Sequence, residues 1–249
     1  MKIVIPARYA STRLPGKPLA DIAGKPMIAH VWDRACEAAP MADVYIAADD
    51  DRILKAVKAF GGQGVMTRAD HASGTDRIAE VADTFGWADD EIVVNVQGDE
   101  PLIPSALIAL VGEGLAADGR ADMATASTRI TSTDDVLNPN IVKVVSDVFG
   151  YARYFSRSVI PYMRGADVPD VNKYAYQRHI GIYAYKVDTL KRLTALNPAE
   201  VEEIEALEQL RALHHGLTIR VAETSEAPPH GVDTEADLVA VRSLLGAGA

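Results

Sequence analysis

Lys2-Ile3-Val4-Ile5-Pro6 is a short apolar run, and it is followed by the segment Ala7-Arg8-Tyr9-Ala10-Ser11-Thr12-Arg13-Leu14-Pro15-Gly16-Lys17-Pro18. The run predicts a buried strand, and the segment, with its glycine, prolines, serine and arginines, predicts a loop. A helix over about 26–38 follows, with proline at its start. A strand, a loop and a helix in this order predict the first unit of an α/β fold.

The same alternation continues along the chain. Further strands are expected over 44–48, 64–67 and 92–96, and helices over 51–60, 74–85 and 105–115. Alternating strands and helices imply parallel strands joined by right-handed crossovers. We therefore expect an α/β fold of Rossmann-like type, a layered and mostly parallel sheet with helices on both faces.

The pattern changes in the second half of the chain. Strand-like segments come in less regular order, at 123–130, 141–146, 151–155 and 176–185, with an exposed loop over 164–174. The remaining elements are expected to be helices over 187–193 and 202–214, a strand over 218–222 and a helix over 234–245. Because no long linker or repeat divides the chain, we expect a single domain over 1–249 with a smaller lobe inserted at about 130–190.

The composition is that of an ordinary globular protein, with 48% hydrophobic and 24% charged residues among 249. The net charge of −10 argues against binding to nucleic acid, whose phosphates select basic surfaces. No apolar run is long enough to span a bilayer, and the run at residues 3–5 is too short for a signal peptide. We therefore expect a cytoplasmic protein without a membrane span.

Positive charge gathers in the first loop although the whole chain is acidic. Before Asp21 the sequence carries Lys2, Arg8, Arg13 and Lys17 and no acidic side chain. Small residues would let backbone N–H groups approach an anion, and the basic side chains would add charged donors. The loop has neither the Walker A pattern nor the dinucleotide fingerprint, so a nucleotide site here would be of another type. The alternative is a solvated basic loop.

Two acidic residues are candidate ligands for a metal ion. Asp99 comes just after the strand at 92–96, and Asp233 lies in Gly231-Val232-Asp233-Thr234. Two carboxylates at one sheet edge could hold Mg²⁺, which prefers oxygen ligands. The alternative is that Asp233 or Thr234 caps the final helix. The single cysteine, Cys36, lies among apolar residues at helical spacing and is expected in the core, so neither a disulfide nor a cysteine zinc site is expected.

Taken together, several motifs in colinear order over nearly the whole chain resemble one family. They are Ile5 to Leu19, Thr67-Arg68-Ala69-Asp70-His71, Ser73-Gly74-Thr75-Asp76-Arg77, Asn95 to Pro101, Asn138-Pro139-Asn140, Phe155-Ser156-Arg157, Arg178 to Tyr183, Leu207 to Arg211 and Gly231 to Thr234. This set is similar to that of the 3-deoxy-manno-octulosonate cytidylyltransferases. The resemblance implies the nucleotide-diphospho-sugar transferase type of fold, and it makes the inserted lobe one for sugar binding and dimerisation.

The resemblance implies a nucleotidyltransferase that uses CTP. The anomeric 2-hydroxyl of 3-deoxy-D-manno-octulosonate would attack the α-phosphorus of CTP, giving the CMP-sugar and pyrophosphate for lipopolysaccharide synthesis. Asp99 and Asp233 would hold Mg²⁺ and, with Arg8 and Lys17, would be the catalytic groups. The residues implied to bind the nucleotide are Pro6, Ala7, Arg8, Arg13, Lys17, Ser73, Arg77 and Asp99.

For the sugar, the resemblance implies Gln97, Arg157, His179, Tyr183, Glu208 and Gln209. Arg157 would hold the sugar carboxylate through two hydrogen bonds. On a helix over 202–214, Glu208 would lie about 40° from Ile204 around the axis, beside the inward stripe, where a carboxylate needs a partner. The alternatives are a surface salt bridge for Glu208, with Arg211 or Arg192, and a strand histidine satisfied by protein groups for His179.

Several alternatives stay open from the sequence alone. The sugar could be the 8-amino-3,8-dideoxy analogue or a sialic acid, since a few loop side chains would distinguish them. A non-catalytic nucleotide-sensing module would keep Arg8, Arg13 and Lys17 but could lose Asp99 or Asp233. The presence of both acids favours the enzyme. The resemblance also implies a homodimer, formed through the strands between 141 and 185.

Overall fold

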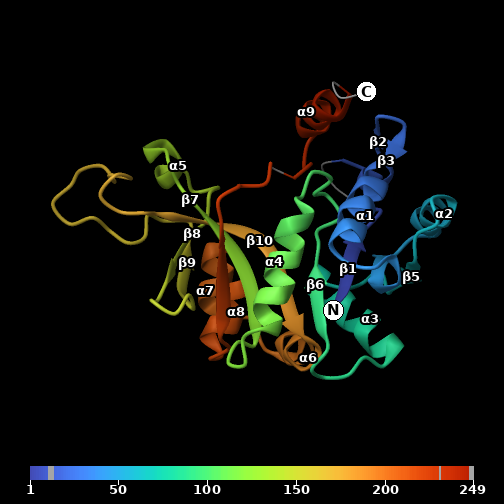
Figure 1. Ribbon diagram of the computed structural model, residues 1–249, viewed down its shortest axis with the longest axis horizontal. Helices are drawn as coiled ribbons and strands as arrows, with labels where there is room; N and C mark the ends of the chain where they lie inside the picture. Colours follow the sequence, from blue (N-terminus) through green and yellow to red (C-terminus); the bar gives the residue numbers. More distant parts are fainter. Residues whose placement is uncertain (11–13, 230, 247–249) are drawn as a thin grey trace. The chain divides into compact units, whose positions relative to one another are not determined.

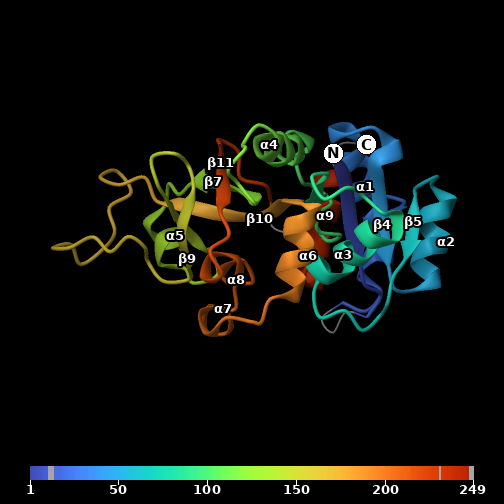
Figure 2. The same cartoon turned by 90° about the horizontal axis from the view of Figure 1, so that it is seen from below.

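The computed structural model describes residues 1–10, 14–229 and 231–246, in two compact units. The first unit consists of residues 1–109 together with the segment from 228 onward, and the second consists of residues 110–227 (Figures 1 and 2). The lobe expected at about 130–190 lies within the second unit.

The first unit is built on parallel strands with β1 (Lys2–Ala7) between two others. β1 pairs with β4 (Val44–Ala48) on one side and with β6 (Ile92–Asn95) on the other, and β4 pairs with β5 (Gly64–Met66). Side chains of β1, β4 and β6 are almost entirely buried on both faces. Such continuous apolar runs are typical of parallel strands covered by helices on both sides.

Helices cover both faces of this sheet, as the sequence predicts. α1 (Met27–Ala38) and α2 (Asp51–Ala59) connect strands that step in one direction from β1, whereas α3 (Gly74–Phe85) leads back to β6 on the other side of β1. Because these crossovers are right-handed, the reversal places α3 on the face opposite α1 and α2. On that face Tyr45 of β4 packs against Phe85 of α3, with ring centroids 5.0 Å apart.

The end of the chain is anchored to the first unit by a small apolar cluster. α9 (Glu235–Gly246) contributes Leu238 and Val241, which pack with Ile22 of β2 (Asp21–Ile22). β2 pairs with β3 (Lys25–Pro26), and Val232 is buried in the same cluster. This packing fixes the backbone on either side of Asp233.

The second unit has a mixed sheet. β7 (Met123–Arg129) pairs antiparallel with β10 (Gln177–Lys186) and parallel with β11 (Ile219–Thr224). β10 also pairs with β8 (Lys143–Ser146), which forms a hairpin with β9 (Ala152–Ser156). The helices of this unit are the second half of α4 (Ser105–Ala116), followed by α5 (Thr133–Leu137), α6 (Val187–Ala195), α7 (Glu200–Glu205) and α8 (Gln209–His214).

The expectation of one helix over 202–214 is wrong. Ala206 has a φ of 50°, in the left-handed region, and it separates α7 from α8 (Figure 1). Ile204, placed inward by the expected single helix, is 75% exposed. The break changes the direction of the chain before Glu208, so the wheel argument for Glu208 no longer applies.

The ends of β1 and β6 approach each other closely at Gly98. A Cβ atom added at Gly98 would lie 2.6 Å from the backbone oxygen of Pro6. Since the chain steps away from β1 in both directions, this is the topological switch point of the first unit, where α/β sheets bind ligands at the carboxyl ends of their strands.

Gly98→Ala should therefore disturb this edge of the sheet. The added methyl group meets backbone rather than a flexible side chain, so we expect a loss of about 1–3 kcal/mol in the free energy of unfolding, the range for overpacked sites. Urea unfolding measures it. Gly119→Ala is the matched control, because nothing lies within 4 Å of a Cβ at that position. Equal stability of the two variants would contradict the close approach.

Candidate functional site

A cavity of about 410 Å³ lies at the switch point of the first unit, within the size range of small-molecule sites. Residues from the end of β1, the first loop, the start of α3 and the segment after β6 line it. Its lining consists of Pro6, Ala7, Arg8, Ala10, Lys17, Pro18, Gly74, Arg77, Gln97, Gly98, Asp99 and Asp233. Most of the residues expected to bind a nucleotide therefore come together here.

Lys17 is the most closely held cation in this cavity. Gly16 has a φ of 69° and precedes the short turn Lys17–Leu19, so a residue free to adopt the left-handed region starts the turn. The Lys17 ammonium donates to Asp99 Oδ2 at 2.6 Å, to Asp233 Oδ1 at 3.2 Å and to the carbonyl of Val232 at 3.0 Å. The side chain is only 15% exposed, so solvent screens these charges weakly.

The structure separates the roles of Asp233 and Thr234. Thr234 caps the start of α9, because its hydroxyl accepts the Asp237 N–H at 3.3 Å and its own N–H donates to Asp237 Oδ2 at 2.8 Å. The carboxylate of Asp233 faces Lys17. Capping therefore does not account for Asp233. A backbone bond of 2.8 Å from the N–H of Val232 to the carbonyl of Asp99 keeps the two acids together.

The pair of acids fits a magnesium ion by its chemistry. Both carboxylates contact one ammonium group, so they already converge on a single centre of positive charge. Among the described residues no cluster of three or more His, Cys, Asp or Glu side chains is arranged for a metal. Mg²⁺ needs no such cage, since it commonly binds one or two carboxylates together with substrate phosphates and water.

Arg77 forms a second charged group in the cavity. Its side chain is fully buried, and it donates to Asp49 at 3.2 Å and to the hydroxyl of Thr67. Its Nε atom has no hydrogen-bond partner among the described residues. Burial lowers the pKa of Arg77, and the nearby charge of Arg8 acts in the same direction. A buried cation with a donor to spare suits an anionic or polar ligand.

Ser73 has a structural role in the fold, and Arg13 is not among the described residues. Ser73 caps α3 in a capping box, accepting the Asp76 N–H at 3.2 Å, while its neighbour Gly74 lines the cavity. Arg13 lies outside the described residues. The N–H of Gly16 donates to the carbonyl of Tyr9 at 3.2 Å, so the two described ends of the first loop are joined.

The residues expected to bind sugar fall into both units. Gln97 lines the cavity of the first unit, whereas the remaining five, Arg157, His179, Tyr183, Glu208 and Gln209, belong to the second unit. The rings of His179 and Tyr183 lie 5.5 Å apart on β10, and Phe155 of β9 meets His179 edge-on at 4.9 Å. Burial raises the pKa of Tyr183 well above its usual value, and the nearby groups Tyr185 and Glu208 act in the same direction, so the carboxylate just before α8 lies near this ring.

His179 and Gln209 differ in their hydrogen-bond partners within the described residues. Thr125 Oγ1 lies 3.0 Å from His179 Nε2, and its single hydroxyl proton has the carbonyls of Ile180 and Ile182 within reach, at 3.1 and 2.8 Å, around an irregularity in β10. Bulges of this kind re-aim side chains and are common beside functional sites. Gln209 is buried, and its amide nitrogen has no hydrogen-bond partner among the described residues. Such a donor is suited to a ligand hydroxyl.

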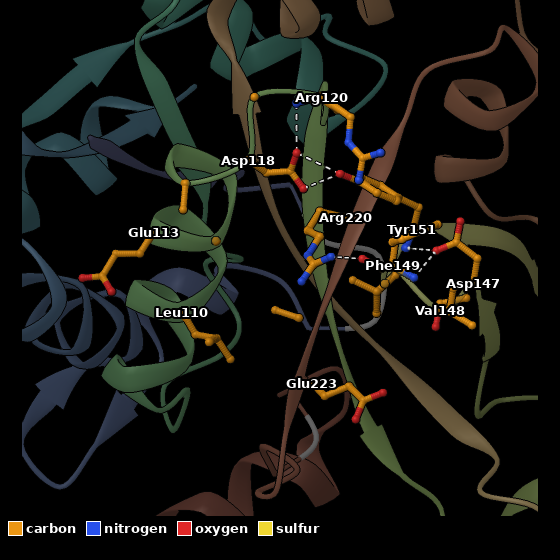
Figure 3. A pocket seen from close by; sticks show the side chains of 17 residues that line it. Leu110, Glu113, Asp118, Arg120, Asp147, Val148, Phe149, Tyr151, Arg220 and Glu223 are labelled. Atoms are coloured by element: carbon orange, nitrogen blue, oxygen red, sulfur yellow. Dashed lines mark hydrogen bonds between the residues drawn. The ribbon is translucent and has the colours of Figure 1, made fainter.

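A larger cavity, of about 900 Å³, contains none of the expected site residues (Figure 3). It lies in the second unit between the end of α4, the β8–β9 turn and β11. Two of its acidic groups, Asp118 and Asp147, are engaged in local structure. Tyr151 donates its hydroxyl to Asp118 at 2.7 Å, and Asp147 accepts the N–H groups of Phe149 and Tyr151. The chemistry therefore centres on the smaller cavity.

Some residues of the site escape sequence reasoning. Asp49 pairs with Arg77 and also accepts the N–H of Tyr9 at 2.9 Å; because it directly follows β4, the rule that selected Asp99 could have found it. Gly98 could have been found, because a glycine directly before an acidic residue at a strand end often permits close approach. Lys143 is fully buried in a strand, and its ammonium donates to three carbonyls.

The fold and this site are those of a nucleotidyltransferase. The profile of a family described as Cytidylyltransferase matches residues 2–219. Relatives named 3-deoxy-manno-octulosonate cytidylyltransferase are 55% identical in Hahella chejuensis, over 98% of this chain and 96% of the relative, and 56% identical in Cellvibrio japonicus, over 99% and 98%. The chain therefore belongs to the cytidylyltransferase family, among the 3-deoxy-manno-octulosonate cytidylyltransferases.

Two solved structures also match this chain. A CMP:2-keto-3-deoxy-manno-octonic acid synthetase complexed with CTP matches with a TM-score of 0.91 and 46% identity, over 100% of this chain and 99% of that one. A cytidylyltransferase from Leptospira borgpetersenii, at 18% identity and a TM-score of 0.63 over 99% and 86% of the two chains, shares the fold. Within the described residues, no helix combines the length and apolar character needed to cross a bilayer.

The environment of His179 makes a prediction about pH. Burial of the ring, with the charge of Arg178, lowers its pKa to about 3. The unfolded chain takes up this proton below about pH 6.5. The folded chain does not, so the ring's contribution to stability is complete above about pH 6.5 and is lost as the pH falls toward about 3.

Urea unfolding between about pH 4.5 and 7.5 should therefore show a smaller loss of stability at low pH in His179→Gln than in the parent. The sign follows because the variant no longer binds the extra proton in its unfolded state. NMR of the His179 ring in the parent should show no titration in this range. A midpoint near pH 6.5 would contradict the assigned environment.

Proposed function

We propose that this chain transfers CMP from CTP to the anomeric 2-hydroxyl of 3-deoxy-D-manno-octulosonate and releases pyrophosphate. The observation that carries the proposal is the grouping of Lys17, Asp99 and Asp233 in the cavity at the switch point. The full-length similarity to a synthetase complexed with CTP and to enzymes named for this sugar supports both substrates.

The reaction requires neutralisation of charge more than covalent assistance. The sugar hydroxyl oxygen forms a bond to the α-phosphorus as the bond from that phosphorus to the pyrophosphate oxygen breaks, and the hydroxyl proton is released. Both substrates are anionic, so cations must offset their repulsion. Lys17 and Arg8 line the cavity, and Arg13 is proposed to join them on the triphosphate. Lys17 would exchange its carboxylate partners for phosphate oxygens.

Asp99 and Asp233 are the proposed ligands of Mg²⁺. The ion when bound would supply a Lewis acid that offsets negative charge on the phosphates. The carboxylates themselves hold the positive charge of Lys17 in the cavity. A backbone bond from the N–H of Val232 to the carbonyl of Asp99 also fixes the loop after β6 against the segment before α9.

The walls of the cavity suit a pyrimidine base. Pro6, Ala7 and Gly98 line the cavity, and backbone at Pro6 and Ala7 is proposed to help exclude a larger purine. Arg77 offers a buried donor to the nucleoside. Ser73 is proposed to act there through the capped start of α3, whose Gly74 lines the cavity.

The sugar is assigned to Gln97 and to the group on the second unit formed by Arg157, His179, Tyr183, Glu208 and Gln209. Glu208 can accept from sugar hydroxyls, and Gln209 can donate its buried amide. His179 is neutral at physiological pH, so it would act as a hydrogen-bonding group without charge.

Three further assignments rest on the family. The product would serve lipopolysaccharide synthesis. We assign the enzyme to the cytoplasm, where nucleoside triphosphates are available. A homodimer formed through the second unit is also proposed.

Pyrophosphate release tests the function directly. CTP with 3-deoxy-D-manno-octulosonate should give rapid release, whereas UTP, ATP or GTP should give little, and CTP without sugar should give none. The 8-amino-3,8-dideoxy analogue and a sialic acid belong in the same assay, because faster release with either would reassign the sugar. CTP binding without release for every sugar would support a nucleotide-sensing module.

Asp99→Asn and Asp233→Asn should each lower turnover about 100-fold or more, equivalent to about 2.7 kcal/mol in the barrier. Each change keeps the shape of the side chain but removes a charge that holds Lys17 and, as proposed, Mg²⁺. Turnover is measured over a range of Mg²⁺ concentrations. Asp90→Asn, on an exposed turn of the first unit, is the control. Parental rates and Mg²⁺ dependence in either site variant would refute the assignment.

A further inference from the structure

The turn between α7 and α8 has an unusual backbone. Ala206 adopts a φ of 50°, a left-handed conformation that is unfavourable for a residue with a side chain. Glu208 and Gln209 follow after Leu207. A turn of this kind persists only where surrounding contacts hold it, so the contacts around Ala206 decide where the two side chains lie.

Arg157 holds the backbone of this turn. Its Nε donates to the carbonyl of Glu205 at 2.7 Å, and its Nη2 donates to the carbonyl of Ala206 at 3.3 Å. Its Nη1 donates to the carbonyl of Pro139 at 3.1 Å. These three bonds use three of the five N–H groups of the guanidinium, and they hold it against the backbone of the turn.

The carboxylate of Glu205 accepts two hydrogen bonds from the end of β9. One carboxylate oxygen accepts the hydroxyl of Ser156 at 2.5 Å, and the other accepts the N–H of Arg157 at 2.9 Å. The carbonyl of Arg157 in turn accepts from the fully buried ammonium of Lys143 at 2.6 Å. The end of β9 and the α7–α8 turn are therefore joined in both directions: the side chain of Arg157 donates to the backbone of the turn, and the side chain of Glu205 accepts from the backbone of Arg157.

The same end of β9 also contacts the other sugar candidates. Phe155, which precedes Ser156, packs edge-on against His179 with ring centroids 4.9 Å apart. One short stretch, residues 155–157, therefore contacts His179 through Phe155 and the α7–α8 turn through Ser156 and Arg157.

We propose that Glu205, together with Ser156 and Arg157, is a positioning group for the sugar site, and we call these three residues the clamp. It fixes the α7–α8 turn so that Glu208 and Gln209 are held near His179 and Tyr183. Arg157 acts here through its bonds to the backbone of this turn. This inference rests on the proposed function, because it concerns the site assigned there to the sugar.

A double-mutant cycle tests the coupling. Glu205→Gln, Arg157→Ala and the double variant are compared by kcat and KM for the sugar at saturating CTP, with Glu208→Ala as the reference for direct loss of a sugar contact. We expect each single change to lower kcat/KM for the sugar about tenfold or more. The double variant should lose little beyond the larger single loss, since both changes break one unit.

Two further measurements separate positioning from general damage. CTP affinity, measured by calorimetry without sugar, should stay within about threefold of the parent in each variant, because the clamp lies in the second unit. Hydrogen exchange should become faster at residues 205–210 in both single variants. Glu203→Ala, an exposed change on α7, is the matched control and should leave the kinetics and the exchange unchanged.

Each outcome bears on a definite claim. Additive losses, or a large loss in Arg157→Ala with parental kinetics in Glu205→Gln, would overturn the clamp and return Arg157 to direct sugar contact. Faster exchange at 205–210 with unchanged sugar kinetics would make the clamp purely structural and would also overturn the proposal. If the parent enzyme releases no pyrophosphate with CTP and the sugar, the proposed function itself fails, and the positioning role assigned within it fails with it, whatever the exchange data show.

Discussion

The ammonium group of Lys17 is the point on which the candidate site depends. It joins the first loop to Asp99, 82 residues along the chain, and to Val232 and Asp233, about 215 residues along. The ammonium lies 2.6 Å from Asp99 Oδ2 and 3.2 Å from Asp233 Oδ1, so one cation faces both acids. The same arrangement answers the main demand of phosphate chemistry, namely that positive charge stand ready where phosphates bind. The remaining features of the first unit serve to bring these three segments together.

The fold could be predicted where a single physical rule dominates. The apolar runs at β1, β4 and β6 and the helices between them follow from periodicity, and the position of Asp99 follows from the rule that ligands bind at the carboxyl ends of parallel strands. The choice between capping and ligation at Asp233 could not be made, because Asp233 and Thr234 both fit a cap locally. Only the burial of Val232 beside α9 directs one side chain to Asp237 and the other to Lys17.

The helix expected over 202–214 fails for a different reason. Its residues have good helix propensity, and nothing in Glu205-Ala206-Leu207 resembles a stop signal, since glycine is the usual left-handed residue. The break is imposed by tertiary contacts from Arg157 and Ser156, which lie about fifty residues earlier. A local propensity of a few tenths of a kcal/mol per residue is readily exceeded by several charged hydrogen bonds at about 1.5–3 kcal/mol each. Sequence reasoning of a local kind therefore had no means of finding it.

The two units hold charge in different ways, and the difference corresponds to what each is proposed to bind. In the first unit, cations stand in a cavity with carboxylates that a polyanion could displace, so its charged groups are exchangeable. In the second unit, the charged groups Lys143, Arg157 and Glu205 bond to backbone and hydroxyl partners and shape the turn. The other groups assigned to the sugar there are a neutral His179, a phenol, the carboxylate of Glu208 and an amide that lacks a partner among the described residues. Such a surface favours the hydroxyl groups of a sugar over a phosphate, because it offers hydrogen bonds of fixed direction without a strong field.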